Sequence, residues 1–322
     1  MGDGSPPPGG TLGPPAMNAV VDPSKVLPGA ARAGHAFLHA DWREEYLTRG
    51  YVVLRGVFSA AEMRAIQAAA ERAYAEGMRH HATWRQQNRV FWIHHHPAVG
   101  RFVSGCQWQA WVDPVLDAVR TDARLLAMLA PLIGRDLKQI INQVHWKAPG
   151  TGHVWSMHQD VRSRRPAECF RELATSYVQT GLAIGPHTKS NGAMRVIPGS
   201  HLRGDLRINE GRSSFTEARE DAVAEAGLDP DAAVAVEMEP GDVALWSPYV
   251  VHGGGINRSR DDFRPFYING YVTAANCDRG QPVFADGVPV PLVTPAVIQH
   301  EDVATRTEAH YPGAAVVTGP RD

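Results

Sequence analysis

The chain has 322 residues, of which 43% are hydrophobic and 20% charged. This composition is typical of a globular protein with one large core or two small ones, and it excludes a disordered or fibrous protein. Its 32 Lys and Arg residues nearly balance 34 Asp and Glu residues, which leaves a net charge of −2. Because nucleic acids and anionic membranes are bound through a basic excess, we expect neither as a partner. The sequence leaves the formation of a homo-oligomer open.

The cysteines and the apolar segments bear on the cellular compartment. Cys106, Cys169 and Cys277 are odd in number and far apart, and no CxxC pair is present. This favours a reducing environment over a disulfide framework, a zinc knuckle or a redox dithiol. No stretch reaches 18 apolar residues, and the N-terminus lacks the basic and then apolar order of a signal peptide. We therefore expect a cytoplasmic protein.

The N-terminal third is expected to be a tail followed by helices. Residues 1–29 are dense in proline and glycine without any helical or strand period, which predicts a flexible tail. Residues 30–322 show no internal repeat and are expected to form a single domain. Tyr51–Leu54 predicts a short buried strand. Ser59 and Glu62 form a capping box that opens a helix, and residues 113–134 repeat a helical pattern that Pro131 bends or ends. These signals predict a mainly helical part over about 35–136.

From Leu137 onward the chain changes to short runs of β-branched and aromatic residues between turn residues. The runs occupy residues 138–147, 175–184, 194–198, 234–238, 242–246 and 265–272. A helix-rich part followed by closely spaced strands predicts an α+β protein with a double-stranded β-helix, that is, a jelly-roll or cupin-like core. We expect this core over about 137–275, flanked by the N-terminal helices and followed by a C-terminal segment, 276–322.

Two imidazoles and a carboxylate suggest a metal site. His158 and Asp160 stand two residues apart, so on an extended chain both side chains face the same side. Such a pair is more often a surface feature than a metal site. His252 follows an apolar strand and precedes three glycines, which allow close backbone approach. Two histidines and one carboxylate form the facial triad of non-haem Fe(II) oxygenases.

Arg264 follows twelve residues after His252, at the start of the next strand-like run. A guanidinium there is able to bind a carboxylate by two parallel hydrogen bonds inside a partly desolvated barrel. The alternative is a surface ion pair at a strand end.

These motifs, in this order, resemble the phytanoyl-CoA dioxygenase family of Fe(II)- and 2-oxoglutarate-dependent oxygenases. The resemblance extends over most of residues 45–275. It is carried by residues 49–63, 147–150, 157–160, 190–204 and 240–252, and by Arg264. It implies that His158, Asp160 and His252 bind Fe(II) and that Arg264 pairs with the distal carboxylate of 2-oxoglutarate. With O₂, the co-substrate would leave as succinate and CO₂.

The resemblance also implies a reaction class. An unactivated C–H of a small molecule would usually be hydroxylated, the substrate being a secondary metabolite, an amino-acid derivative or an acyl compound. Desaturation, epoxidation and ring formation remain open. Halogenating relatives carry a small residue at the carboxylate position, so Asp160 speaks against halogenation.

Four further residues are predicted to contact ligands. Gln143, His145 and Lys147 alternate along one strand and share a face. We expect Gln143 and Lys147 to contact the co-substrate, with a solvated strand edge as the alternative. Gln179 and Gly181 share a face of the next strand as candidate substrate contacts. Similar proteins often carry a bulky aromatic near the position of Gly181, so glycine there predicts a larger substrate pocket.

The segment after Asp160 holds Arg162, Arg164, Arg165 and Arg171. Its loop would overhang the metal, and Arg162 and Arg165 are candidates to bind an anionic substrate, with a solvated charge run as the alternative. His94–His96 predicts a polar loop before Pro97, or else the lining of a lid. The turn residues Asn191–Gly192 and the neighbouring His201 are expected to be scaffold.

Two other classes of protein remain open. A zinc hydrolase would use the same two histidines and carboxylate with a metal-bound water, and it would not need Arg264. A non-catalytic jelly-roll binding module would keep the metal for structure or hold none.

Overall fold

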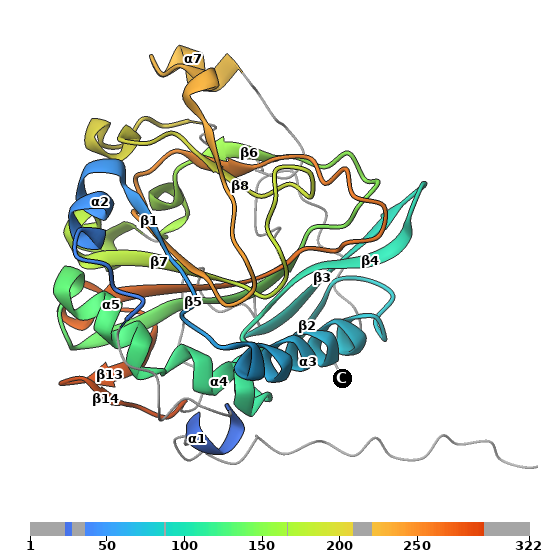
Figure 1. Ribbon diagram of the computed structural model, residues 1–322, viewed down its shortest axis with the longest axis horizontal. Coiled ribbons are helices and arrows are strands. Elements are labelled where there is room, and N and C mark those ends of the chain that lie inside the picture. Colours follow the sequence, from blue (N-terminus) through green and yellow to red (C-terminus); the bar gives the residue numbers. More distant parts are fainter. Residues whose placement is uncertain (1–22, 28–35, 87, 166, 209–220, 293–322) are drawn as a thin grey trace, which may run out of the picture.

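Two antiparallel sheets form the centre of the molecule (Figure 1). The computed structural model describes residues 23–27, 36–86, 88–165, 167–208 and 221–292. The large sheet has the strand order β1 (Tyr51–Leu54), β10 (Val243–Trp246), β7 (Tyr177–Ala183), β12 (Pro265–Thr273), β5 (Leu137–Trp146), β4 (Gly100–Gln107), β3 (Arg89–His96), β2 (Trp84–Gln86), and β13 (Gln281–Ala285) pairs with both β5 and β14 (Val288–Pro289). The small sheet has the order β6 (Trp155–His158), β11 (His252–Gly254), β8 (Met194–Val196), β9 (Val234–Val236).

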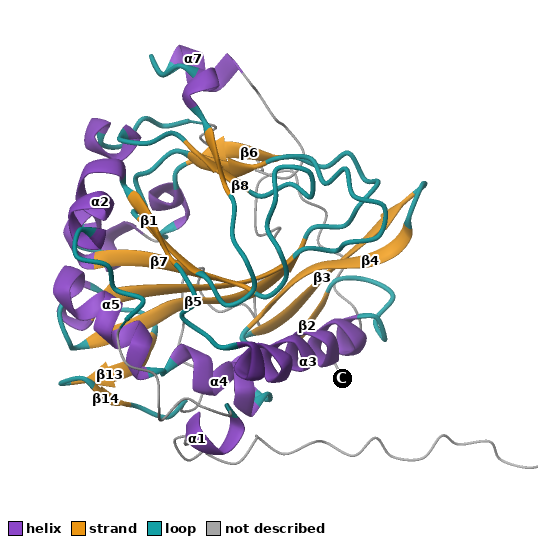
Figure 2. Ribbon diagram, viewed as in Figure 1, coloured by secondary structure: helices purple, strands orange, loops and turns teal. Residues whose placement is uncertain are grey.

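Several helices gather on one side of the large sheet, whereas the small sheet and the short helix α7 (Asp221–Glu225) lie on the other (Figure 2). The helices are α1 (Pro23–Val26), α2 (Trp42–Arg49), α3 (Ala60–Gly77), α4 (Pro114–Arg120), α5 (Ala123–Ile133), α6 (Leu173–Ser176) and α7 (Asp221–Glu225). Helices α3, α4 and α5 run along the face of the large sheet turned away from β6 and β8. The fold is therefore the predicted α+β architecture with a jelly-roll core.

Strand β10 illustrates how the large sheet is covered on both faces. Val243 and Leu245 belong to the hydrophobic core shared with the helices. Ala244 and Trp246, the residues between and after them, belong to the core between the two sheets. This alternation is the period of two of an extended chain. Because both faces are buried, the strand is apolar throughout, and the sheet presents a second set of side chains to the interior of the jelly roll.

The strands expected from the sequence are present, but the N-terminal part is less helical than predicted. Residues 84–107 form β2, β3 and β4, which extend the large sheet beyond β5. His94–His96 lie on β3 and pair with Phe102, Arg101 and Gly100, so the predicted polar loop is wrong. The polar run stays extended because its backbone is hydrogen-bonded across a hairpin, and the His94 ring stacks on Phe102 at 5.5 Å between centroids.

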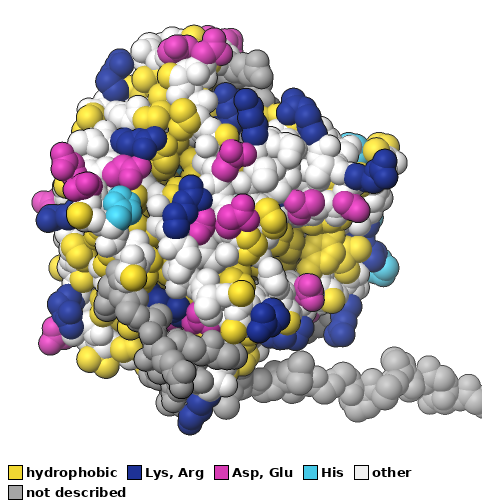
Figure 3. Space-filling view, in the orientation of Figure 1, with side chains coloured by type: hydrophobic (Ala, Val, Ile, Leu, Met, Phe, Trp, Pro, Cys, Tyr) yellow, Lys and Arg dark blue, Asp and Glu magenta, His cyan; other side chains and the backbone are white. Residues whose placement is uncertain are grey.

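The predicted flexible tail is also wrong for residues 23–27. Pro23–Val26 forms α1, and Leu27 is fully buried in the core on the helix side of the sheet. An apolar side chain with a site to fill offsets the entropy cost of ordering a short segment. Residues 1–22 and 28–29 of the predicted tail and residues 293–322 of the C-terminal segment lie outside the described residues. On the face seen in Figure 3, acidic and basic side chains are interspersed, in line with the near-zero net charge.

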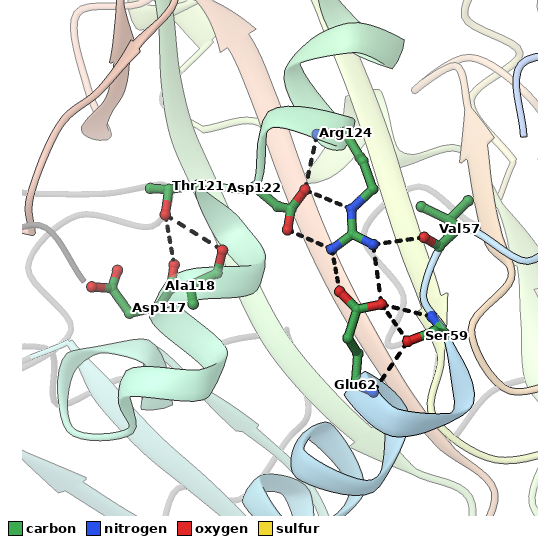
Figure 4. Close-up of polar contacts among 8 residues, drawn as sticks. All are labelled: Val57, Ser59, Glu62, Asp117, Ala118, Thr121, Asp122 and Arg124. Carbon is green, nitrogen blue, oxygen red and sulfur yellow. Dashed lines mark hydrogen bonds and ion pairs between the residues drawn. The ribbon is translucent and has the colours of Figure 1, made fainter. Parts of the chain in front are cut away.

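A buried charge cluster joins α3 to α5 (Figure 4). The predicted capping box is present, with Ser59 N donating to Glu62 Oε2 at 2.7 Å. Arg124 Nη2 donates to Glu62 Oε1 and to Asp122 Oδ2, each at 2.7 Å, and its Nη1 donates to Val57 O at 2.9 Å. All three charged side chains are at most 5% exposed. Removal of the guanidinium would therefore leave two buried carboxylates without their cation.

We expect Arg124→Met to lower the free energy of unfolding by about 3–5 kcal/mol, because an unpaired buried charge is costly. Urea unfolding at pH 7 measures this change. Arg72→Met is the matched control, since Arg72 also pairs with a carboxylate, that of Asp113, but is 56% exposed. Its loss should cost less than about 1 kcal/mol. Equal losses in the two variants would contradict the role given to burial.

Candidate metal centre

Two adjacent strands of the small sheet bring the three predicted metal ligands together. His158 ends β6 and is the register partner of His252, which begins β11. Asp160 is the first residue of a short 3₁₀ helix, η3 (Asp160–Ser163), that follows β6. The Nε2 atoms of His158 and His252 lie 3.8 and 3.6 Å from the two oxygens of the Asp160 carboxylate. One ligand atom from each residue lies within 4.8 Å of the other two.

Backbone carbonyls fix the orientation of both imidazole rings. Nδ1 of His158 lies 2.8 Å from Ser156 O, and Nδ1 of His252 lies 3.0 Å from Val250 O. A carbonyl oxygen only accepts hydrogen bonds, so Nδ1 carries the proton in each ring and Nε2 presents its lone pair to the carboxylate side. Burial, followed by the proximity of His252, lowers the pKa of His158 to about 4, which keeps this imidazole neutral at pH 7.

The carboxylate is held charged. Trp246 Nε1 donates to Asp160 Oδ2 at 3.0 Å, and Arg164 Nη2 lies 3.9 Å from Oδ1. Burial alone would raise the pKa of Asp160, but His252, Arg164 and His158 outweigh it and the pKa falls below its ordinary value. Two imidazole nitrogens and one carboxylate oxygen facing one point suit Fe(II) and also Zn²⁺. Among the described residues this is the only cluster of such ligands.

The three residues line a cavity between the two sheets. Its walls come from β5, β7, β10 and β12 of the large sheet and from β6, β11 and η3 on the opposite side. The polar side chains that line it besides the three ligands are Gln143, His145, Ser163, Arg164, Gln179 and Arg264. The cavity is thus partly polar and lies inside the jelly roll, and a molecule bound in it would contact the three candidate metal ligands.

Arg264 enters this cavity as a buried cation held by neutral groups. It is 5% exposed, and the ion pairs of the described residues include none to its guanidinium. Its Nη1 lies 3.1 Å from Nδ1 of His187, whose Nε2 lies 3.2 Å from Pro265 O. The carbonyl requires the proton on Nε2, so Nδ1 accepts from Arg264. Burial lowers the pKa of Arg264 to about 10, so the guanidinium remains charged at pH 7.

The loop before β12 fixes the backbone of Arg264. Its φ is +27°, an unusual value for a residue with a side chain. Asp262 holds this conformation, since its Oδ1 accepts from Arg264 N at 2.9 Å. Asp262 Oδ2 in turn accepts from Asn191 Nδ2 at 2.6 Å. Asn191 therefore has a structural role, as its position in a predicted turn suggested.

The two residues predicted to contact the co-substrate are placed differently. Gln143 lines the cavity, and its Oε1 accepts from His145 Nε2 at 2.9 Å. Lys147 lies just beyond β5 and lines a neighbouring cavity together with His94, Phe102 and His153. Its Nζ donates to Gly254 O at 3.4 Å, and burial together with Arg264 lowers its pKa to about 6. Gln143 and His145 thus share a face as predicted, whereas Lys147 does not, because β5 ends before it.

Gly181 does not enlarge the pocket as the sequence suggested. A Cβ atom at this position would lie 2.1 Å from the Phe266 ring. Phe266 comes from the neighbouring strand β12, lines the cavity and stacks on Trp246 at 6.1 Å between ring centroids. The aromatic wall missing at Gly181 is therefore supplied from the next strand. Gln179, the other predicted contact, does line the cavity and is 4% exposed.

Of the arginine cluster, only Arg164 lines the cavity. Arg162 pairs with Asp205 at 3.2 Å, and Arg165 is exposed. Arg171 forms an exposed ion pair with Asp278 at 2.7 Å. Arg164 is 2% exposed because η3 turns the chain with about three residues per turn, which carries this side chain inward after Asp160. The sequence around Arg164 contains no pattern that predicts its burial in the cavity.

Sequence reasoning also missed Trp246, His187 and Phe266. Trp246 ends the apolar strand that precedes His252 by six residues, so its closeness to the site could have been suspected from this short separation along the chain. His187 and Phe266 touch the site only through pairing between β7, β12 and the loop before β8, which no local pattern reveals.

Comparisons with known proteins agree with this fold. The fold and the ligand set define a jelly-roll protein with a candidate two-histidine, one-carboxylate metal centre. The sequence profile of the phytanoyl-CoA dioxygenase family (PhyH) matches residues 46–266. The chain belongs to this family. A dioxygenase of Epichloe uncinata, lolE1, is 27% identical over 173 residues, which are 54% of this chain and 59% of that protein. A probable phytanoyl-CoA dioxygenase of Caenorhabditis elegans is 30% identical over 163 residues, which are 48% and 45% of the two chains.

Solved structures share the fold. EctD from S. alaskensis, solved with 2-oxoglutarate and 5-hydroxyectoine, has a TM-score of 0.58 and 20% identity, and the match covers 94% of this chain and 95% of that one. The epimerase SnoN of nogalamycin biosynthesis, solved with Fe³⁺ and α-ketoglutarate, has a TM-score of 0.55 and 19% identity over 76% and 95% of the chains. The chain spans about three fifths or less of the curated relatives it matches. In the described part of the chain, no helix combines the length and apolar character needed to cross a bilayer.

We expect Trp246→Phe to weaken divalent metal binding about 10- to 100-fold. The variant keeps an aromatic ring but removes the Nε1 donor to Asp160, and such supporting hydrogen bonds tune metal affinity. Titration of the metal-free protein with Mn²⁺, followed by thermal stabilisation, measures the affinity. Trp108→Phe, at a buried tryptophan of the helix-side core, is the control and should bind Mn²⁺ as the wild type does. Equal affinities in all three proteins would contradict the prediction.

Proposed function

We propose that the protein is an Fe(II)- and 2-oxoglutarate-dependent dioxygenase that hydroxylates an unactivated C–H of a small molecule. The observation that carries the proposal is a single cavity lined by His158, Asp160 and His252 together with the buried Arg264. Family membership and curated relatives named dioxygenases support it. When bound, Fe(II) with 2-oxoglutarate and O₂ supplies the oxidising power, and the co-substrate leaves as succinate and CO₂.

In this proposal the chain positions its ligands and keeps water out. His158, Asp160 and His252 hold the metal on one side, which leaves its remaining positions facing the cavity. Arg264 binds the distal carboxylate of 2-oxoglutarate, since it is a charged guanidinium without an acidic partner among the described residues. Gln143 is a candidate contact to the co-substrate from β5, and Lys147 a weaker one from the neighbouring cavity.

The buried Arg264 favours this function over a zinc hydrolase. A hydrolase needs the metal-bound water but not a desolvated guanidinium, whose burial without a bound anion is costly. The same cost speaks against a binding module that holds only a structural metal.

The free thiols Cys106, Cys169 and Cys277 fit a cytoplasmic location.

The proposal is tested by adding Fe(II) and 2-oxoglutarate to the protein without oxygen. We expect a visible metal-to-ligand charge-transfer band in the wild type and its loss in Asp160→Ala. With O₂ and ascorbate, succinate should form above the Asp160→Ala background. Absence of the band in protein that is fully loaded with Fe(II) would overturn the proposal.

We expect Arg264→Ala to raise the 2-oxoglutarate concentration at which the charge-transfer band reaches half of its maximum intensity. The increase should be about 10- to 100-fold, because the substitution removes a charge-assisted pair. Arg171→Ala removes an exposed arginine from its pair with Asp278 and is the control, expected to match the wild type. An unchanged requirement in Arg264→Ala would show that the carboxylate is bound elsewhere.

We propose that His187 positions Arg264 for this contact. His187→Phe keeps a buried ring but removes the Nδ1 acceptor, so the KM for 2-oxoglutarate should rise about 3- to 10-fold with little change in kcat. His201→Phe is the control, because His201 bonds to Leu47 O away from the cavity. A fall in kcat at constant KM would contradict a positioning part.

A further inference from the structure

A second buried guanidinium shares the cavity with Arg264. Arg164 lies at the end of η3, is 2% exposed and lines the cavity on the side of Asp160. In the proposed reaction its one part is the 3.9 Å pair that helps keep Asp160 charged, because the metal is held by three other side chains and the co-substrate by Arg264. A buried cation is costly, so its presence calls for a partner.

The protein holds Arg164 in a fixed orientation by one of its nitrogens. Nη2 donates to Tyr177 Oη at 2.8 Å and to Gln179 Oε1 at 3.1 Å, and it lies 3.9 Å from Asp160 Oδ1. The guanidinium carbon lies 4.7 Å from the centre of the Tyr177 ring. Within the described residues no partner is recorded for Nε, which is buried, and none for Nη1. The guanidinium is thus preorganised with donor capacity left over.

Of the three neighbours recorded for Nη2, only one is charged. The Tyr177 hydroxyl and the Gln179 amide are uncharged, and burial keeps the tyrosine protonated by raising its pKa. The third is the Asp160 carboxylate, which forms a long ion pair with Nη2 at 3.9 Å and is also a metal ligand in the proposed function. Because this pair engages only Nη2, the buried Nε and Nη1 remain available to a further acceptor.

The charges of the cavity lead to the same requirement. Its lining carries two guanidinium groups, Arg164 and Arg264, and one carboxylate, Asp160. A divalent metal and the dianion of 2-oxoglutarate cancel, so one positive charge remains once both are bound. In a poorly solvated cavity that charge attracts one further negative group.

We propose that the primary substrate carries a carboxylate, which Arg164 binds inside the metal cavity. This inference rests on the proposed function and specifies its substrate class. Gln179 and Tyr177 act as positioning residues for the guanidinium, while Arg162 and Arg165 take no part, since neither lines the cavity. Two-point binding of the carboxylate would use the nitrogens that the protein leaves without a partner.

The test uses the protein loaded with Fe(II) and saturating 2-oxoglutarate, without oxygen. Matched pairs of probes differ only in charge: benzoate and benzamide, phenylacetate and phenylacetamide, hexanoate and hexanamide. Their dissociation constants are read from the change that each probe causes in the charge-transfer band. Persistence of the band shows that the carboxylate has not displaced 2-oxoglutarate from Arg264.

In the wild type, we expect at least one carboxylate to bind about 10-fold or more tightly than its amide. Arg164→Gln should reduce this preference to less than about 3-fold, and Arg164→Lys should keep part of it. Arg165→Gln, which removes a neighbouring exposed charge, is the matched control and should keep the full preference. If Arg164→Gln loses the preference for carboxylates but keeps the charge-transfer band, the metal site is intact and the substitution has removed carboxylate binding alone.

Two results would overturn the inference: no pair in which the wild type prefers the carboxylate, or an unchanged preference in Arg164→Gln. Should Arg164→Gln fail to fold, the wild-type preference and the Arg164→Lys variant decide in its place. Absence of the charge-transfer band in the loaded wild type would instead reject the proposed function itself, and this inference with it.

Discussion

Burial of the large sheet on both faces is the constraint on which the rest of the structure depends. Helices cover one face, and the small sheet, with the loops that join it, covers the other. Because side chains alternate across a strand, each central strand sends every second residue into the space between the sheets. The cavity is built from that set: Gln179 on β7, Trp246 on β10 and Phe266 on β12 all belong to it. A slip of one residue in any of these strands would turn its contribution toward the helices.

The same enclosure governs the electrostatics of the site. Low solvent access keeps the imidazole of His158 neutral, as a metal ligand must be, while Trp246 and Arg164 keep Asp160 charged. Arg264 stays a cation even though it is buried, because burial lowers its pKa only to about 10 while the charge of Asp262 acts in the opposite direction. Groups of opposite character are thus stabilised in one cavity by different means: carbonyls orient the histidines, an indole supports the carboxylate, and neutral side chains hold the guanidiniums. Ligand binding then completes a charge pattern that the protein alone leaves unbalanced.

The fold could be predicted where a local pattern reports a local structure. Short apolar runs such as Val243–Trp246 became strands, and the Ser59 capping box began a helix, because each depends on neighbouring residues. The prediction failed for β3 and β4, which lie in the part expected to be mainly helical and include His94–His96, expected to be a polar loop. Their extended form depends on pairing with β5 and with each other, a non-local stabilisation that no window of sequence contains. Leu27 is similar, since its burial depends on a surface made by distant helices.

For the site, the sequence by itself determined the candidate ligands and the buried arginine: His158, Asp160, His252 and Arg264. Their order along the chain indicates them through the resemblance to the phytanoyl-CoA dioxygenase family, whereas spacing alone places only His158 and Asp160 on one side of an extended segment. Only the tertiary structure decided which arginine of the cluster enters the cavity, that Phe266 fills the space beside Gly181, and that His187 faces Arg264. These contacts join elements up to about eighty residues apart, and their geometry depends on strand register and on a single 3₁₀ turn. Contacts of this range are selected by packing, in which each side chain takes the space that its neighbours leave.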